Sequence, residues 1–242
     1  MKKLLIFSLV CIAACGKKNN KPDYEAGLIR NIEKARSDEQ KLTWLSRLAW
    51  YYIDIDRKKS DSMMSAAYSF AASTKDNGII SLAYLYDAQR HLLLDDYKNE
   101  MNKVSALAKD ASDQVSSGNY PDYIAYSYLY QAHSARKLGN IQEAEGYLSQ
   151  AYNFVKDTES DSLKIEYYYL HSQVSQDRRD VNQALLDALQ VRRTAEQSKN
   201  QYLKLMAYLR LGIVYEDIDP VKAKENYQDL AELSKKQAML SS

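Results

Sequence analysis

The sequence predicts an all-α fold, an α-solenoid of about five antiparallel helix pairs. Its 242 residues include only 7 Gly and 3 Pro, so few positions interrupt helices. Apolar residues recur at spacings of three and four through most of the chain, which is the period of a helix with a buried face. Helix-length segments of this kind alternate with short polar turns at a period of about 40 residues. Such a repeat is typical of solenoids, in which neighbouring pairs share one continuous core.

The first fifteen residues form a separate targeting segment. Lys2 and Lys3 precede an apolar run, Leu4 to Ala14, that is too short to span a bilayer. The run ends in Ile-Ala-Ala-Cys-Gly, which resembles a bacterial lipobox, where small residues precede a cysteine that is lipidated and becomes the new N-terminus. The resemblance implies that residues 1–14 are a lipoprotein signal peptide and that Cys15 is the membrane anchor. The alternative is an ordinary cleaved secretory signal with a chance cysteine.

Residues 15–23 are predicted to be the lipidated cysteine and a flexible polar tether. Gly16 lacks the acidic character of signals that retain lipoproteins at the inner membrane. The acid-rich stretch that resembles surface-export signals is also missing. We therefore expect an outer-membrane anchor that faces the periplasm.

The charge and cysteine content exclude several classes of function. Without residues 1–14, which carry two lysines and no acid, the formal charge falls from +1 to −1, a balance that argues against a nucleic-acid partner. Cys11 would leave with the signal and Cys15 would be acylated. We therefore expect no disulfide, no thiol-based redox chemistry and no zinc site in the mature chain.

Residues 24–242 are predicted to form one helical repeat domain, with a short leading helix from residue 24 to about 36. First helices are expected over residues 42–55, 80–93, 123–138, 164–176 and 202–215. Each second helix should begin after a capping residue, and the residue four positions after the cap is small in every pair except the second. The caps are Ser62, Asp96, Asn140, Asp180 and Asp219, and the later residues are Ala66, Glu100, Ala144, Ala184 and Ala223.

The last pair carries the clearest family pattern. Tyr208-x2-Leu211-Gly212-x2-Tyr215, followed by Ala223-x3-Tyr227, resembles the tetratricopeptide repeat, although the inner turn is one residue short. The resemblance covers residues 39–238 and is weaker in the first two pairs. It implies a right-handed superhelix whose first helices line a concave surface that binds proteins or peptides.

Mapping the family's groove positions onto this sequence gives a mildly apolar, uncharged set of candidate binding residues. They are Leu48, Tyr51, Leu82, Leu85, Gln89, Tyr126, Leu129, His133, Tyr169 and Gln173. The alternative is that most of these side chains simply pack inside a tight solenoid. The lysine and asparagine clamp that some family members use for a terminal carboxylate is absent from these positions.

No pattern in the sequence indicates catalysis, a cofactor or a metal. His91, His133 and His171 recur in the first helices, but they lie five, seven and nine residues before the next cap, so they should not face one another. Gly-rich phosphate loops, HExxH and nucleophile elbows are missing, and paired acids such as Asp54 and Asp56 fall at helix ends. We expect a protein that is not an enzyme.

The combination of an anchor and a repeat domain favours a membrane-anchored scaffold that binds a protein or peptide in the cell envelope. Three alternatives stay open. The protein could be an outer-membrane assembly or pilot lipoprotein, or a sensory repeat module that works with a separate signalling protein. It could also bind glycans through exposed aromatic residues such as Tyr126 or Tyr130.

The last pair poses a separate question, because no further repeat covers it in this sequence. Either residues 221–240 shield Met206, Leu209 and Ile213, or the end offers an apolar edge to a partner. An open end would be the first place to look for a binding site.

Overall fold

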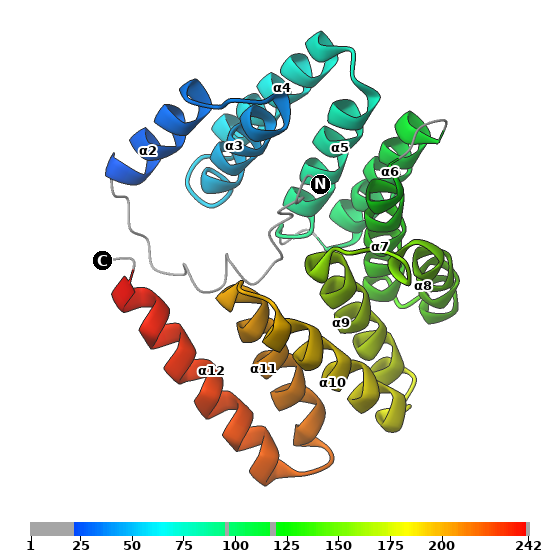
Figure 1. Ribbon diagram of the computed structural model, residues 1–242. Coiled ribbons are helices and arrows are strands. Elements are labelled where there is room, and N and C mark those ends of the chain that lie inside the picture. The colour runs from blue at the N-terminus through cyan, green and yellow to red at the C-terminus, as the bar shows by residue number, and fades with distance from the viewer. Residues whose placement is uncertain (1–21, 95–96, 117–119, 241–242) are drawn as a thin grey trace. The chain divides into compact units, whose positions relative to one another are not determined.

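The computed structural model describes residues 22–94, 97–116 and 120–240 (Figure 1). All regular secondary structure in these residues is helical, and consecutive helices pack pairwise, which confirms the predicted all-α class. The signal segment and Cys15 lie outside the described residues. The helices are α2 (Pro22–Glu33), α3 (Asp38–Tyr51), α4 (Arg57–Thr74), α5 (Asn77–His91), α6 (Tyr97–Val115), α7 (Pro121–Lys137), α8 (Ile141–Val155), α9 (Asp161–Asp177), α10 (Val181–Gln197), α11 (Gln201–Glu216) and α12 (Pro220–Leu240).

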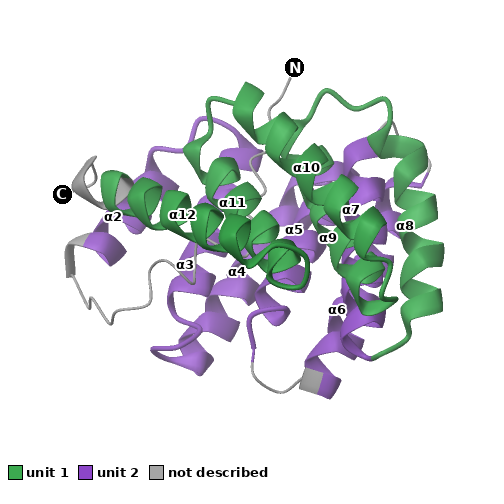
Figure 2. Cartoon of the chain, turned by 90° about the horizontal axis from the view of Figure 1, so that it is seen from below, with its two compact units in different colours: residues 1–16, 139–242 green, residues 17–138 purple. Residues whose placement is uncertain are grey.

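The chain divides into two compact units (Figure 2). The N-terminal unit, residues 17–138, contains α2 to α7, and the C-terminal unit contains α8 to α12 from residue 139 onward. In the N-terminal unit the leading helix α2 packs on α3, and α5 packs on α3, α4, α6 and α7. In the C-terminal unit α9 packs on α8 and α10, and α11 packs on α9, α10 and α12.

Short polar side chains fix where several helices begin. The Asp180 carboxylate accepts a hydrogen bond from the Gln183 amide at 3.0 Å, and the Asp219 carboxylate accepts from the amides of Val221 and Lys222 at 3.2 Å each. These bonds satisfy amide groups that have no partner within the helix. The predicted caps of the fourth and fifth pairs are therefore confirmed, whereas Asp96 lies outside the described residues.

The predicted register of the first pair is wrong by six residues. Helix α4 is capped by Asp56, which accepts from the Lys59 amide at 3.1 Å, and not by Ser62. Four residues after this cap stands Ser60, which is fully buried, while Ala66 is exposed. The reason is that the Ser60 hydroxyl donates to the Ala49 carbonyl at 2.8 Å, so a small polar residue fills the position that alanine fills in later pairs.

Buried serines join helices elsewhere in the N-terminal unit in the same way. Ser81 donates to the Ala111 carbonyl and Ser134 to the Met101 carbonyl, each at 2.7 Å. A hydroxyl bonded to a carbonyl of a neighbouring helix lets two backbones approach closely and leaves no buried polar group unpaired. Serine therefore shares the small-residue positions with alanine.

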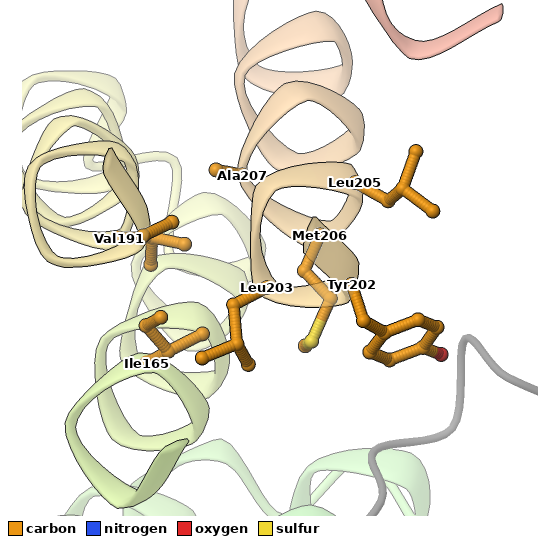
Figure 3. Packing of buried hydrophobic residues seen from close by; sticks show 8 residues of the cluster. Ile165, Val191, Tyr202, Leu203, Leu205, Met206 and Ala207 are labelled. Atoms are coloured by element: carbon orange, nitrogen blue, oxygen red, sulfur yellow. The ribbon is translucent and has the colours of Figure 1, made fainter. Parts of the chain in front are cut away.

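Helix α11 is enclosed by its neighbours in the C-terminal unit (Figure 3). Leu203 and Ala207 of α11 belong to one buried cluster with Ile165 of α9 and Val191 of α10. On the other side, Gly212 lies so close to Tyr227 of α12 that an added Cβ would stand 2.5 Å from the tyrosine ring. The glycine is therefore needed because a large residue occupies the facing position.

Candidate functional site

The structure places most of the predicted groove residues in the interior. Of the ten, six are buried, namely Leu48, Leu82, Leu85, Gln89, Tyr126 and Leu129. Half-buried positions are held by Tyr51, His133, Tyr169 and Gln173. This distribution is the one expected for packing residues. Tyr126 and Tyr130 are 0% and 5% exposed, so the glycan-binding alternative loses the two tyrosines on which it depended.

The three histidines lie in two kinds of setting. His91 and His171 each contact a carboxylate of the next helix, Glu100 and Asp187 respectively. Burial, with the nearby charge of Arg136 as a smaller cause, lowers the pKa of His133 to about 3. The described part of the chain contains no cluster of three or more His, Cys, Asp or Glu side chains placed to hold a metal ion.

A buried ionic network joins α4, α5 and α6, and sequence reasoning missed it. Its inner members, Asp87, Arg90, His91 and Glu100, are each at most 7% exposed. The Arg90 guanidinium contacts the Asp87 carboxylate through Nε and the Asp61 carboxylate of α4 through Nη1, both at 2.7 Å. Buried charges are costly unless they are paired in this way, so the network holds the three helices in one register.

The contacts around His91 define its tautomer. Its Nε2 lies 3.3 Å from an Arg90 guanidinium nitrogen, and a guanidinium can only donate, so Nε2 accepts. Nδ1 therefore carries the proton that His91 donates to the Glu100 carboxylate. The sequence signal was available, because Glu100 is the one charged residue in a row of otherwise small residues.

Glu100 is held in its ionised form. Burial raises its pKa, but the hydrogen bonds from His91 and Lys103 and the nearby charge of Lys103 outweigh burial, and the net pKa is lowered. Two cations at the rim, Arg57 at 3.6 Å and Lys103 at 3.3 Å, complete its surroundings. The network is a structural clamp whose members all have partners within the chain.

A second histidine and carboxylate pair joins α9 to α10. His171 donates from Nδ1 to the Asp187 carboxylate at 2.6 Å, and its ring stacks on Tyr167 with centroids 5.7 Å apart. The other Asp187 oxygen accepts a hydrogen bond from the Gln183 side-chain amide, Nε2, at 3.1 Å. This pair also has its main polar contacts within the unit, and it orients α9 on α10.

The described structure has an open groove on the last helix pair. It has a volume of about 450 Å³ and is mostly apolar. Its lining comes from the end of α11 and one face of α12, and consists of Glu216, Pro220, Ala223, Lys224, Tyr227, Gln228 and Ala231. Met206, whose shielding was in question, is buried, while Leu209 and Ile213 are half-buried. The open surface therefore lies on α12 itself.

The repeat shows what this face does in the preceding pair. Residues of α10 lie 39 positions before their counterparts in α12, so Leu185, Ala188 and Arg192 correspond to Lys224, Tyr227 and Ala231. On α10, Leu185 and Ala188 pack against α11, and the Arg192 guanidinium lies 5.9 Å from the centroid of the Tyr208 ring of α11. The groove on α12 thus lies on the face that corresponds to the α11-binding face of α10.

Polar groups at the groove differ in whether they have partners. The Tyr227 hydroxyl donates to the Glu216 carboxylate at 2.6 Å. Burial and this hydrogen bond raise the pKa of Tyr227 to about 12, so the phenol stays protonated and keeps donating. Lys224 is exposed and forms no ion pair or hydrogen bond with the residues that the structure describes. The groove therefore offers an apolar floor, one satisfied acid and one free ammonium group.

None of the described helices is both long and apolar enough to cross a membrane.

Comparisons with known proteins identify only the fold. No known family matches the sequence, and no curated protein is similar to it. Among solved structures, the chain is similar to BtubC (BKLC) from P. vanneervenii, with a TM-score of 0.64 and 17% identity over 91% of this chain and 92% of that chain. At this identity the likeness supports a helical-repeat fold and nothing more specific.

Proposed function

We propose that the protein is a membrane-anchored, TPR-like lipoprotein that serves as a scaffold for a protein or peptide segment in the bacterial cell envelope. Cys15 carries the lipid, and the polar residues up to position 23 tether the repeat domain to the outer membrane on its periplasmic side. The protein works by binding and not by catalysis. Neither a cofactor nor a nucleic acid takes part.

The observation that carries this proposal is the open groove on α12. Three of its lining residues, Lys224, Tyr227 and Ala231, stand at the positions whose counterparts on α10 contact α11, so this part of the surface has the form of a helix-binding site. Small residues, Ala223 and Ala231, leave room for a helix backbone to approach. A surface with this form supports recognition of a protein segment better than recognition of a small molecule or a sugar.

Site-specific photo-crosslinking in the native host tests the binding role. A photoreactive amino acid replaces Gln228 in the groove or, as the matched control, Gln142, an exposed glutamine on α8. We expect position 228 to capture one envelope protein that position 142 does not, and the purified pair to bind in solution. If neither position nor a scan of the other exposed helix faces captures a protein that binds on purification, the scaffold proposal fails.

The anchor is tested separately by Cys15→Ser. We expect wild-type protein to take up a clickable fatty acid and to sediment with outer-membrane vesicles, whereas the variant does neither. Normal labelling and membrane association of the variant would contradict the lipoprotein assignment without affecting the groove.

A further inference from the structure

We infer that the groove on α12 binds an amphipathic helix of a separate partner protein, and that this helix places carboxylates opposite Lys224 and Lys235. The inference rests on the proposed scaffold function and names the chemistry of its partner.

The first step is a contact that recurs in every earlier pair. The fifth residue of each earlier second helix contacts the first helix that follows. Asp61 of α4 pairs with Arg90 of α5 at 2.7 Å, and Glu145 of α8 pairs with Arg178 at the end of α9. The Met101 carbonyl of α6 accepts from Ser134 of α7.

The same position packs Leu185 of α10 against α11. Lys224 is the fifth member of this row, since α12 follows the Asp219 cap. In two of the four earlier pairs the contact is an ion pair that crosses to the next first helix. Lys224 also places a charge at this position, but a positive one where Asp61 and Glu145 are negative. Its counter-charge lies outside the described chain. A carboxylate on an incoming helix completes the row.

The second step is the direction of the incoming helix. Leu203, near the start of α11, packs with Val191 and Ala195 late in α10. Leu211 and Val214, near the end of α11, pack with residues early in α10. A helix seated on α12 in the same way runs antiparallel to it, with its C-terminal half near Lys224. Its apolar stripe follows Leu203, Ala207, Leu211 and Val214, which are spaced by four, four and three residues.

The third step is the charge along the groove. Lys235 is exposed and lies four residues beyond Ala231, so it shares the groove-facing side of α12 with Lys224. Eleven residues of helix separate the two lysines by roughly 16 Å. Glu225 and Glu232 lie about 80–100° around the helix from this line. The Glu216 carboxylate already accepts the Tyr227 hydroxyl. The two lysines on this side of α12 therefore favour a partner helix that carries acidic residues eleven positions apart.

A second copy of this chain fits the groove less well than a separate protein does. Two described helices expose two large apolar residues each, Tyr24 and Ile29 on α2 and Leu186 and Leu189 on α10. Around α2 these two side chains lie about 140° apart, so they form no single apolar stripe. The α10 face carries the exposed Arg193, while its Glu196 already pairs with Arg192. Docking the α10 face would bring Arg193 toward Lys224 and Lys235, which like charges oppose.

A designed helix is the probe. It carries Leu, Ala, Leu and Val at the spacing of the α11 stripe, with two Glu residues eleven apart beside the stripe, and its twin has Lys in place of both Glu. Fluorescence anisotropy measures both Kd values for the mature chain at low and physiological salt. We expect the acidic helix to bind at least tenfold more tightly, with a preference that weakens as salt rises.

Two sets of variants make the test specific. Changing both groove lysines, Lys224→Glu with Lys235→Glu, should reverse the preference, whereas Lys109→Glu, at an exposed lysine on α6, should leave it unchanged. Ala231→Tyr fills the groove and should weaken the acidic helix at least tenfold, while Ala66→Tyr on exposed α4 surface should not. Circular dichroism confirms that each variant folds.

Several results would overturn the inference. If both designed helices bind equally, or if the preference for the acidic helix survives the double lysine change, the lysines play no part in binding. Self-association that Ala231→Tyr abolishes assigns the groove to a second copy. A native partner captured on another face leaves the scaffold function standing and removes the groove as its site. If neither designed helix binds while a native partner crosslinks at Gln228, the groove remains the binding site and only the proposed acidic amphipathic helix is refuted.

Discussion

Replacing Glu100 by Gln tests the ionic clamp of the N-terminal unit. The change keeps the size of the side chain, but it removes the buried charge that His91 donates to and places an amide N–H₂ among donors. A hydrogen bond to a charged group contributes about 1.5–3 kcal/mol, and breaking a buried pair costs up to about 5. The rim partners Arg57 and Lys103 are 43% and 54% exposed, so solvent screens them and they add less than about 1 kcal/mol.

We therefore expect Glu100→Gln to lower the free energy of unfolding by about 2–4 kcal/mol at neutral pH and the melting temperature by roughly 10 °C. Urea unfolding followed by circular dichroism measures the first, and a thermal melt the second. Glu232→Gln, at an exposed position of α12, is the control and should change the free energy by less than about 0.5 kcal/mol.

The pH dependence gives an independent check. The folded-state pKa of Glu100 is lowered from 4.5, so its stabilising contribution is present above that value and is lost as the pH falls through the lower folded-state pKa. Wild-type protein should lose stability below about pH 4.5 more steeply than Glu100→Gln does. The clamp would be refuted if the free energy of unfolding of Glu100→Gln stayed within about 0.5 kcal/mol of the wild-type value at neutral pH. It would also be refuted if both proteins lost stability equally below about pH 4.5.

Three further changes test other parts of the structure. Gly212→Ala should cost about 1–3 kcal/mol because its Cβ would lie 2.5 Å from the Tyr227 ring, and Tyr227→Ala in the same chain should recover most of that loss in urea unfolding. Asp180→Ala should cost about 1 kcal/mol by removing the cap of α10, while Asp180→Asn should cost less. Burial raises the pKa of Glu166 to about 8, so its favourable contribution is full below 4.5 and is lost as the pH rises toward 8. Glu166→Gln should therefore be about 4 kcal/mol more stable than wild type at pH 8 and equal to it at pH 4; equal stability at both would contradict the shift.

The pairing of helices was predictable because it depends on periodicity and on short polar turns. Register is harder, since it depends on which small residue occupies one position per repeat. Counted from a cap at Ser62, the sequence predicts Ala66 at this position in the first pair, whereas the structure places Ser60 there. What decides the register is the hydroxyl that Ser60 donates to Ala49, and a contact between two helices cannot be derived from either helix alone.

The candidate site was only partly predictable for the same reason. Family positions identified side chains such as Leu82 and Leu129, but how deeply a first helix is enclosed depends on its neighbours, and these two are buried. The open face of the last pair was foreseeable from the order of the repeats. Its lysine at position 224 became informative only when the structure showed what the same position touches in earlier pairs.

Departures from the repeat pattern therefore separate into two kinds. Glu100 breaks the row of small residues, and the chain compensates by placing His91 against it, so this departure stabilises the fold. Lys224 replaces the apolar Leu185 of the preceding pair, and the described chain supplies no counter-charge. An exposed lysine costs little by itself, so stability neither requires nor excludes it at this position. The proposed partner would give it a role by supplying the counter-charge, and for this reason the charge reversal at Lys224 tests the groove more directly than any stability measurement does.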